Sequence, residues 1–202
     1  MKLFASSTSP FARKCRIVII EKGLSETVEI IWTSPFEEGP DAKQLRRVNP
    51  LNKIPALLLS SGETVFDSRV ICEFLDGLSE QNPLIPSSGK ARVEALTCIA
   101  LADGILDAAF NVVMELRRPE AIRSEDWISR WLQNIQRAIE FTDWDKRVET
   151  SPNFELSNIG LVCALDYLDF RLPEFDLVSE PARKWRAGFS RFPSLEVTAP
   201  DA

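Results

Sequence analysis

Residues 79–90, SEQNPLIPSSGK, separate two parts of the chain that differ in their predicted secondary structure. Prolines, serines and a glycine crowd this stretch, and that composition is typical of a linker between domains. Before the linker, short runs rich in β-branched residues alternate with helical patterns, whereas no run after it indicates a strand. The sequence therefore predicts two domains, at residues 1–79 and 90–202, joined by a linker at residues 80–89.

The first part has the predicted order β-α-β-α-β-β-α. We expect strands at residues 2–6, 27–32, 54–59 and 63–66, and helices at residues 10–23, 41–47 and 67–78. Pro10 in the first turn and Gly23 past the end are the usual punctuation of a helix. The turn residues 60–63, SSGE, pair the last two strands as a hairpin.

The second part is predicted to be entirely helical. We expect helices at residues 90–117, 125–148, 157–171 and 180–189. The third of these contains the run LVCALDYL and is apolar almost all round, so we expect it to be the buried central helix. The fold class predicted for the whole chain is an α/β domain followed by an all-α domain.

Charge and hydropathy exclude several classes of protein. The chain of 202 residues has a formal net charge of −6 and an isoelectric point near 4.9, so nucleic acid and anionic lipid are poor partners. The N-terminal residues have no apolar run of signal-peptide length. No stretch resembles the ~20 apolar residues of a membrane span. We expect a soluble, cytoplasmic protein with no direct nucleic-acid or membrane partner.

The chain contains no histidine and four cysteines. The missing histidine excludes Ser-His-Asp and Cys-His catalysis and most catalytic zinc sites, so we expect no metal. No two cysteines have the CxxC spacing, and each lies among apolar residues. We interpret Cys15, Cys72, Cys98 and Cys163 as reduced, buried thiols.

Three short motifs fall at the ends of elements in the first part. They are Ser9-Pro10 at the start of the first helix, the run NPLNKIP at residues 49–55, and Phe66-Asp67-Ser68 at the start of the third helix. The first has the shape of a Cys-Pro-Phe-Cys redox motif in which both sulfurs are missing. Because Ala12 stands where a resolving cysteine would be, a dithiol cycle is excluded.

These motifs together resemble the cytosolic glutathione S-transferases. The resemblance spans nearly the whole chain and is closest to a bacterial branch, with a serine at the position of the redox cysteine. It is carried by SPFARKCR (9–16), NPLNKIPAL (49–57), FDSRVICEFLD (66–76), LIPSSGKAR (84–92), ADGILDAA (102–109) and VCALDYLDFR (162–171). It implies a thioredoxin-like domain that binds glutathione, followed by the helical domain.

The resemblance also implies a glutathione site. The Ile54-Pro55 bond is expected to be cis, which leaves the backbone of Ile54 to pair with an extended tripeptide. Asp67 and Ser68 at a helix N-terminus are expected to hold the γ-glutamyl ammonium and carboxylate groups. Lys53 is a candidate partner for the glycyl carboxylate. The alternatives are a strand-initiating proline, a plain helix cap and an exposed lysine.

Ser9 is the candidate catalytic residue. Its hydroxyl is placed to donate a hydrogen bond to the thiolate of glutathione, although a serine that only caps the first helix would have the same sequence. Ser6 and Ser7 compete for the same role. Arg13, Arg16 and Arg69 are interpreted as members of ion pairs within the fold.

The expected reaction is attack of the glutathione thiolate on a small electrophile bound between the domains, as in detoxification. Candidate residues of the electrophile pocket are Phe11, Trp32, Thr33, Asp103, Phe110 and Met114, and a role in the core is the alternative for each. Asp103 lies on the apolar stripe of its helix and needs a partner there. The family implies a homodimer. A non-catalytic relative that serves as a stress or regulatory interaction module is the alternative function.

Overall fold

The structure is a computed structural model that describes residues 1–149 and 154–200. The described chain forms two compact units. Unit 1 combines Met1–Arg92 with the segment that starts at Phe192, and unit 2 is Val93–Arg191. The sequence assigned the segment after Phe192 to the second domain, whereas the structure places it in unit 1; the last two residues of that domain, 201–202, lie outside the described residues.

Unit 1 has the predicted order of elements. These are β1 (Lys2–Ala5), α1 (Pro10–Glu21), β2 (Glu29–Trp32), α2 (Pro40–Val48), β3 (Ala56–Leu58), β4 (Thr64–Val65) and α3 (Ser68–Asp76). The strands form one sheet in the order β2-β1-β3-β4, in which β1 and β2 are parallel and the other two pairs are antiparallel. This mixed sheet and its helices confirm the thioredoxin-like fold class.

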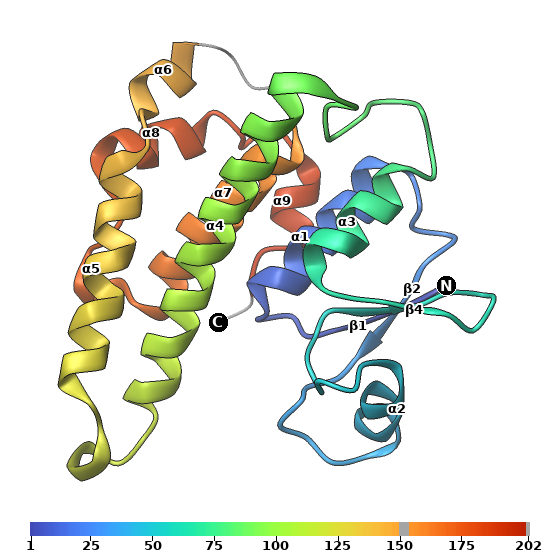
Figure 1. Ribbon diagram of the computed structural model, residues 1–202, viewed down its shortest axis with the longest axis horizontal. Coiled ribbons are helices and arrows are strands. Elements are labelled where there is room, and N and C mark those ends of the chain that lie inside the picture. Colours follow the sequence, from blue (N-terminus) through green and yellow to red (C-terminus); the bar gives the residue numbers. More distant parts are fainter. Residues whose placement is uncertain (150–153, 201–202) are drawn as a thin grey trace. The chain divides into compact units, whose positions relative to one another are not determined.

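The helices of unit 1 cover both faces of the sheet. α1 and α3 lie side by side on one face, and α2 lies on the other (Figure 1). Below the sheet, the buried residues Phe4, Leu45, Val48 and Ala56 form a core cluster. Between α1 and α3, the buried thiols of Cys15 and Cys72 are 3.7 Å apart. The apolar residues of β1 and the apolar face of α1 thus lie in the core.

A buried ion pair joins the C-terminal ends of α1 and α3. The Lys22 ammonium lies 3.0 Å from Oδ1 of Asp76, and its side chain is 0% exposed. Lys22 also donates to the carbonyls of Ser79, Gln81 and Asn82, while Asp76 accepts from the backbone N–H groups of Leu84 and Ile85. The predicted linker is therefore fixed to unit 1 by two paired charges.

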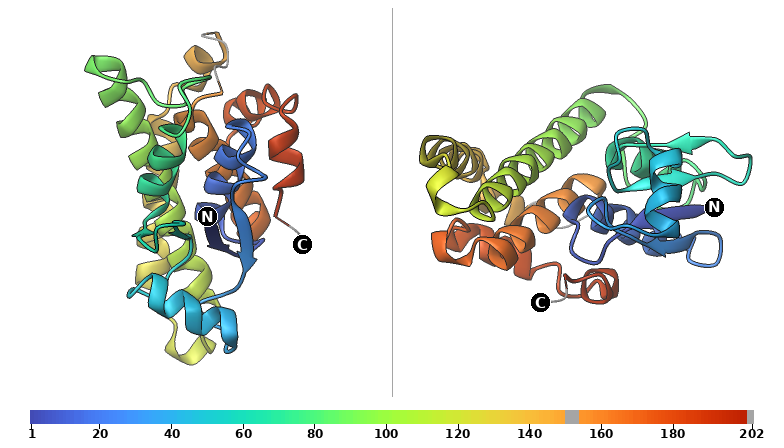
Figure 2. Two further views of the ribbon diagram at one scale, coloured as in Figure 1. Left: turned by 90° about the vertical axis from the view of Figure 1, so that its right-hand side faces the viewer. Right: turned by 90° about the horizontal axis from the view of Figure 1, so that it is seen from below.

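A short helix that the sequence did not predict, α9 (Pro193–Val197), packs beside α1 (Figure 2). Arg13 donates to the carbonyl of Leu195 over 3.0 Å, and Arg16 donates to the carbonyls of Val197 and Thr198. Cations favour the C-terminal end of a helix, where carbonyls lack partners. These arginines thereby attach the C-terminal segment to unit 1.

Unit 2 is all-helical in the residues that the structure describes, which confirms the predicted class. It contains most of α4 (Gly89–Leu116), then η1 (Glu120–Ile122), α5 (Glu125–Phe141), α6 (Trp144–Glu149), α7 (Leu156–Arg171), η2 (Pro173–Phe175) and α8 (Glu180–Ala187). α7 is buried along most of its length, as predicted for the central helix. Trp144, Trp185 and Phe189 pack their rings together at centroid distances of 4.7–5.2 Å.

The single helix expected at residues 125–148 is wrong, because the chain turns between α5 and α6. Thr142 ends α5 with an extended backbone, and its hydroxyl donates to the carbonyl of Ala138. Asp143 then accepts from the N–H of Lys146 and caps α6. The indole of Trp144 donates to the carbonyl of Ile139 over 2.9 Å, so a buried tryptophan fixes this turn. Thr142 thus ends one helix and Asp143 caps the next, and the sequence analysis missed this boundary signal.

By length and composition alone, α4 is apolar enough to cross a membrane, contrary to the expectation from the sequence. Its most apolar window of 18 residues has a mean hydropathy of 1.6, and 56% of that window is buried inside the structure. Core helices of globular proteins have the same composition. We therefore interpret α4 as a core helix of unit 2.

Candidate functional site

The strand register of unit 1 gathers the three sequence motifs at one edge of the sheet. Phe4 lies opposite Ala56, Ala5 opposite Trp32, and Leu57 opposite Val65. The residues that follow β1, β2 and β4 therefore lie at the same edge as those that precede β3. We call this the carboxyl edge; it contains Ser6–Ser9, Thr33, Ile54-Pro55 and Phe66-Asp67.

Ser9 is the N-cap of α1 and is half-buried. Its Oγ accepts a hydrogen bond from the N–H of Ala12 over 3.3 Å. A hydroxyl carries two acceptor lone pairs and one donor, and the cap uses only a lone pair. No residue in the described ranges accepts the Ser9 proton. Ser6 and Ser7 are also half-buried and precede the helix, so all three serines lie at the carboxyl edge.

The Ile54-Pro55 peptide bond is cis, as the sequence predicted. The buried Asn49 fixes the loop before it, because its amide donates to the carbonyl of Lys53 over 2.8 Å and accepts from the N–H of Leu51. The N–H and C=O of Ile54 bind no other residue that the structure describes. They resemble an unpaired strand edge beside β3. The side chain of Lys53 is exposed.

Asp67 is the N-cap of α3, and Ser68 begins the helix. Oδ1 of Asp67 accepts from the N–H of Arg69 over 3.0 Å, and Oδ2 lies 3.5 Å from the Arg69 guanidinium. Asp67 is exposed, whereas Ser68 is only 3% exposed. The Phe66-Asp67 bond is also cis, which the sequence did not predict. The Cys15 thiol lies 3.8 Å from the carbonyl of Ser68, so α1 packs against the first turn of α3.

The residues predicted to line an electrophile pocket fall into two groups. In unit 1, Trp32 and Thr33 lie at the carboxyl edge and Phe11 in the first turn of α1. The Arg16 guanidinium stands 4.9 Å from the centre of the exposed Trp32 ring. Thr33 is buried, and its hydroxyl has no partner among the described residues. The second group lies on α4 in unit 2: Asp103, which is buried, Phe110, which is exposed, and Met114, which is half-buried.

Among the described residues of unit 2, the Cys98 thiol and the Tyr167 phenol have raised pKa values. Burial raises the pKa of the Cys98 thiol, and the Arg147 guanidinium, 3.1 Å from its sulfur, opposes this shift. Burial also raises the pKa of the Tyr167 phenol, against the charges of Arg171 and Arg117. Within residues 1–149 and 154–200, no three His, Cys, Asp or Glu side chains gather as metal ligands.

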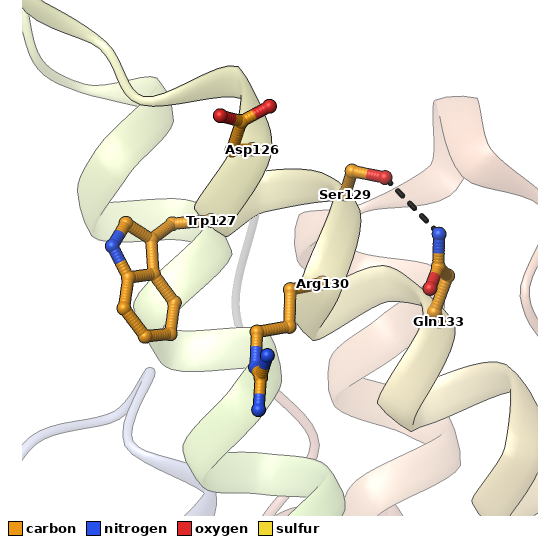
Figure 3. Close-up of a pocket in the computed structure, with 5 residues that line it drawn as sticks. All are labelled: Asp126, Trp127, Ser129, Arg130 and Gln133. Atoms are coloured by element: carbon orange, nitrogen blue, oxygen red, sulfur yellow. Dashed lines mark hydrogen bonds between the residues drawn. The ribbon is translucent and has the colours of Figure 1, made fainter.

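A surface depression on α5 is lined by five side chains of that helix alone: Asp126, Trp127, Ser129, Arg130 and Gln133 (Figure 3). All five are exposed, and Gln133 donates to the Ser129 hydroxyl. None of them belongs to a predicted site. Because a binding pocket is normally lined by buried apolar groups from several elements, this depression is not the candidate site.

Comparisons with known proteins agree with this geometry. The family model described as "Glutathione S-transferase, N-terminal domain" matches residues 8–78, which include all three motifs. The uncharacterized GST-like protein YibF of Escherichia coli is 36% identical over 174 residues, which cover 85% of this chain and 83% of that protein. A stringent starvation protein A homolog of Pasteurella multocida is 31% identical over 60% of both chains.

A solved structure is similar over the full length. The glutathione transferase family member from Pseudomonas fluorescens Pf-5, solved with bound glutathione, has a TM-score of 0.91 and 36% sequence identity. The match covers 100% of this chain and 99% of that one. With the fold, the motifs and two matches that cover most or all of the chain in agreement, the chain belongs to the glutathione S-transferase superfamily.

Proposed function

We propose that this protein is a glutathione S-transferase that binds glutathione at the carboxyl edge and activates its thiol for attack on an electrophile. The observation that carries this proposal is the convergence of Ser9, Ile54 and Asp67-Ser68 at one edge of the sheet. The relative from Pseudomonas fluorescens, similar over its whole length, binds glutathione. Detoxification of small electrophiles is the role that follows.

Binding would use backbone groups and one helix N-terminus. The unpaired N–H and C=O of Ile54 suit an extended peptide, which would add to the sheet as a short strand. The first turn of α3 offers the positive end of a helix dipole to the γ-glutamyl carboxylate, together with the N–H groups that Asp67 does not cap. The exposed carboxylate of Asp67 is available to the ammonium group, and exposed Lys53 to the glycyl carboxylate.

Ser9 would stabilise the thiolate. Lowering a thiol pKa from ~8.5 to about 6.5 takes roughly 2.7 kcal/mol. One hydrogen bond to a charged group supplies about 1.5–3 kcal/mol, and a helix N-terminus adds about 0.3–1 kcal/mol. Capping and activation are compatible, because the cap occupies a lone pair of Ser9 and leaves its proton to donate.

The chemistry proposed for this site is conjugation and not thiol transfer. Ala12 stands where a resolving cysteine would be, and Cys15, one turn further along α1, is 0% exposed. A mixed disulfide with glutathione needs an accessible thiolate at the helix N-terminus. The electrophile would be held by residues from the six candidates Phe11, Trp32, Thr33, Asp103, Phe110 and Met114.

We further propose a cytoplasmic homodimer in which α3 and α4 meet their counterparts. Val70 on α3 and Val93 on α4 are exposed apolar side chains, 51% and 63% exposed, of the kind that a twofold interface covers. All four cysteines are free and buried, as in proteins of a reducing compartment. Sedimentation equilibrium at micromolar concentration should give twice the chain mass of 22.8 kDa. A monomer would refute the dimer and leave the site proposal standing.

A second candidate function is a non-catalytic interaction module. The similarity to a stringent starvation protein A homolog favours it, although the match covers only 60% of each chain. Such a module has no requirement for turnover. The two functions are separated by the rate of conjugation with a reactive electrophile, because an interaction module would show none above the rate without protein.

Calorimetric titration with glutathione tests the binding step. We expect saturable heat at millimolar glutathione or below, and a loss of affinity of about tenfold or more in the double variant Asp67→Ala, Ser68→Ala. The matched control is Asp126→Ala, Ser129→Ala, which removes the same two side-chain types from the depression on α5. Absence of heat and of displacement in the unmodified protein would refute the proposed function.

A further inference from the structure

All aromatic and arginine side chains of α5 lie on one side of that helix. Trp127, Asn134 and Phe141 are spaced seven residues apart, so they follow one line along the helix over about 21 Å. Arg130 and Arg137, also seven residues apart, follow a second line beside the first. We call this surface the aromatic–arginine face; it comprises Trp127, Arg130, Trp131, Asn134, Arg137 and Phe141.

The aromatic residues of this face are accessible to solvent. Trp127 is 52% exposed, and Phe141, at 81%, is the most exposed of the large apolar side chains in the described ranges. The rings of Trp127 and Trp131 stack with their centroids 5.4 Å apart. The core does not require these rings, because α5 packs into unit 2 through a different side, which holds Ile128, Ile135 and Ile139. A continuous apolar surface left exposed on a helix is typical of an interaction site.

The two guanidinium groups of the aromatic–arginine face have no carboxylate partner. Arg130 lies 5.7 Å from the centre of the Trp127 ring (Figure 3), and Arg137 donates a hydrogen bond to Oδ1 of Asn134. Within residues 1–149 and 154–200, neither arginine forms an ion pair. Both side chains are exposed, so their charges are available to a binding partner.

The acidic residues of α5 lie outside this face. Glu125 and Asp126 belong to the first turn, where the positive end of the helix dipole favours a carboxylate. Glu140 accepts a hydrogen bond from Gln136 over 3.0 Å, away from the face. The aromatic–arginine face therefore combines exposed aromatic surface with two cations and no anion, in a chain whose net charge is −6.

We propose that the aromatic–arginine face binds an amphipathic helix of a partner protein, whose apolar residues cover the aromatic rings and whose acidic residues pair with Arg130 and Arg137. This interaction goes beyond the proposed function, since it requires neither glutathione nor an electrophile. Tryptophan and arginine are the residues most enriched among the energetically dominant contacts of protein interfaces. Bonds between guanidinium and carboxylate groups are about twice as strong as bonds between neutral groups.

The spacing of the two lines of residues favours a helix as the partner. Equivalent positions on the face recur about every 10.5 Å, the distance that seven residues span in a helix. A partner helix with a seven-residue repeat of apolar and acidic residues matches this spacing over the whole length of α5. In an extended peptide, side chains on one side recur about every 7 Å, so an extended partner would lose the register.

Two other occupants fit the face less well. A second copy of this chain would present the same two arginines and no carboxylate within the face, so a twofold contact would leave the guanidinium groups unpaired. Single-stranded nucleic acid is anionic and stacks on aromatic rings. However, a chain with a net charge of −6 has no general attraction for it, and Trp127 and Trp131 already stack on each other.

A pair of synthetic peptides of opposite charge tests the proposal. Each fluorescein-labelled peptide consists of three heptads with leucine at positions a and d, and positions e and g are glutamate in one peptide and lysine in the other. Fluorescence anisotropy follows their titration with the full-length protein at about 0.1 M salt. We expect the acidic peptide to bind at least tenfold more tightly than the basic one. The net charge of −6 alone would produce the opposite preference.

Variants of the two lines of residues locate the binding surface. The double variant Arg130→Gln, Arg137→Gln should weaken binding of the acidic peptide at least tenfold, and Phe141→Ala should weaken it severalfold. The matched control is Lys43→Gln, Arg47→Gln, which removes two exposed cations from α2 and should change this affinity less than twofold. Thermal unfolding of each variant establishes that a loss of binding is not a loss of fold.

Several outcomes would overturn the proposal. They are the absence of binding by either peptide, equal or tighter binding of the basic peptide, and a loss in the α2 control as large as in the α5 double variant. Tighter binding of a labelled oligothymidylate than of the acidic peptide, lost in the α5 double variant, would assign the face to nucleic acid. Self-association of the protein that the same variant abolishes would assign it to a second copy. None of these measurements depends on glutathione, so their failure leaves the proposed function untouched.

Discussion

The candidate groups in unit 1 and those in unit 2 are positioned by different means. At the carboxyl edge, Ser9, Ile54 and Asp67 act through backbone geometry: two helix caps and one unpaired strand edge, each at the end of an element. In unit 2, the candidates Asp103, Phe110 and Met114 are side chains along one helix, α4. A site built from backbone groups tolerates changes of neighbouring side chains. A site built from side chains along a helix changes its shape and polarity with each substitution. We therefore expect the proposed glutathione contacts to depend less on neighbouring side chains than the proposed electrophile contacts do.

The largest effect, on the stability of unit 1, should come from the buried ion pair that joins the ends of α1 and α3. Lys22→Met leaves the Asp76 carboxylate buried without its cation, so the free energy of unfolding should fall by about 3–5 kcal/mol. Lys2→Met is the control, because the exposed pair of Lys2 and Glu29 contributes only about 0–1 kcal/mol. Denaturant unfolding measures both. Equal losses of unfolding free energy in the two variants would show that the stability of unit 1 does not depend on the buried pair.

The next effect is chemical and concerns Ser9. Ser9→Ala should lower turnover with a reactive electrophile by about one to two orders of magnitude at neutral pH, from the loss of ~1.5–3 kcal/mol of thiolate stabilisation. Affinity for glutathione should change little, because the other contacts remain. Raising the pH should restore much of the rate, since more of the bound thiol then ionises without the serine.

Ser7→Ala is the control for that experiment, and the ultraviolet absorbance of bound thiolate at pH 7 is the direct readout. If Ser9→Ala leaves this absorbance unchanged and lowers only stability, by about 1 kcal/mol, Ser9 is a cap and the activating group lies elsewhere at the carboxyl edge. Ser9→Cys sharpens the same point. It should reduce conjugation and introduce thiol transfer through a mixed disulfide.

The smallest effect is a pH dependence of stability that originates in unit 2. Burial raises the pKa of the Cys98 thiol in the folded protein, so the unfolded chain loses this proton first as the pH rises. The contribution of Cys98 to stability is therefore complete below about pH 9 and falls as the pH rises toward the folded pKa. Cys98→Ala should flatten the decline in the free energy of unfolding above pH 9. A decline as steep as before would assign it to other groups.

The order of elements in unit 1 could be read from the sequence because each signal there is local. Pro10 and Gly23 bracket α1, and the residues SSGE make the hairpin turn, whereas the cis Ile54-Pro55 bond was expected from the resemblance of NPLNKIP to the family's motif. The candidate glutathione residues were likewise expected from the resemblance, whose motifs occupy a few consecutive residues at the ends of elements. The break between α5 and α6 was missed although Thr142-Asp143 carries a cap signal, because the apolar spacing continues through it to Trp144.

The fold class, the family resemblance and the candidate residues at element ends could thus be inferred from the sequence. The attachment of α9 to α1 through Arg13 and Arg16, and the burial of Lys22 together with Asp76, became visible only in the folded chain. The difference arises from how far apart in the sequence the interacting residues are. Caps and turns depend on neighbours within four residues, whereas a buried ion pair joins side chains that are distant in the sequence and adjacent only after folding.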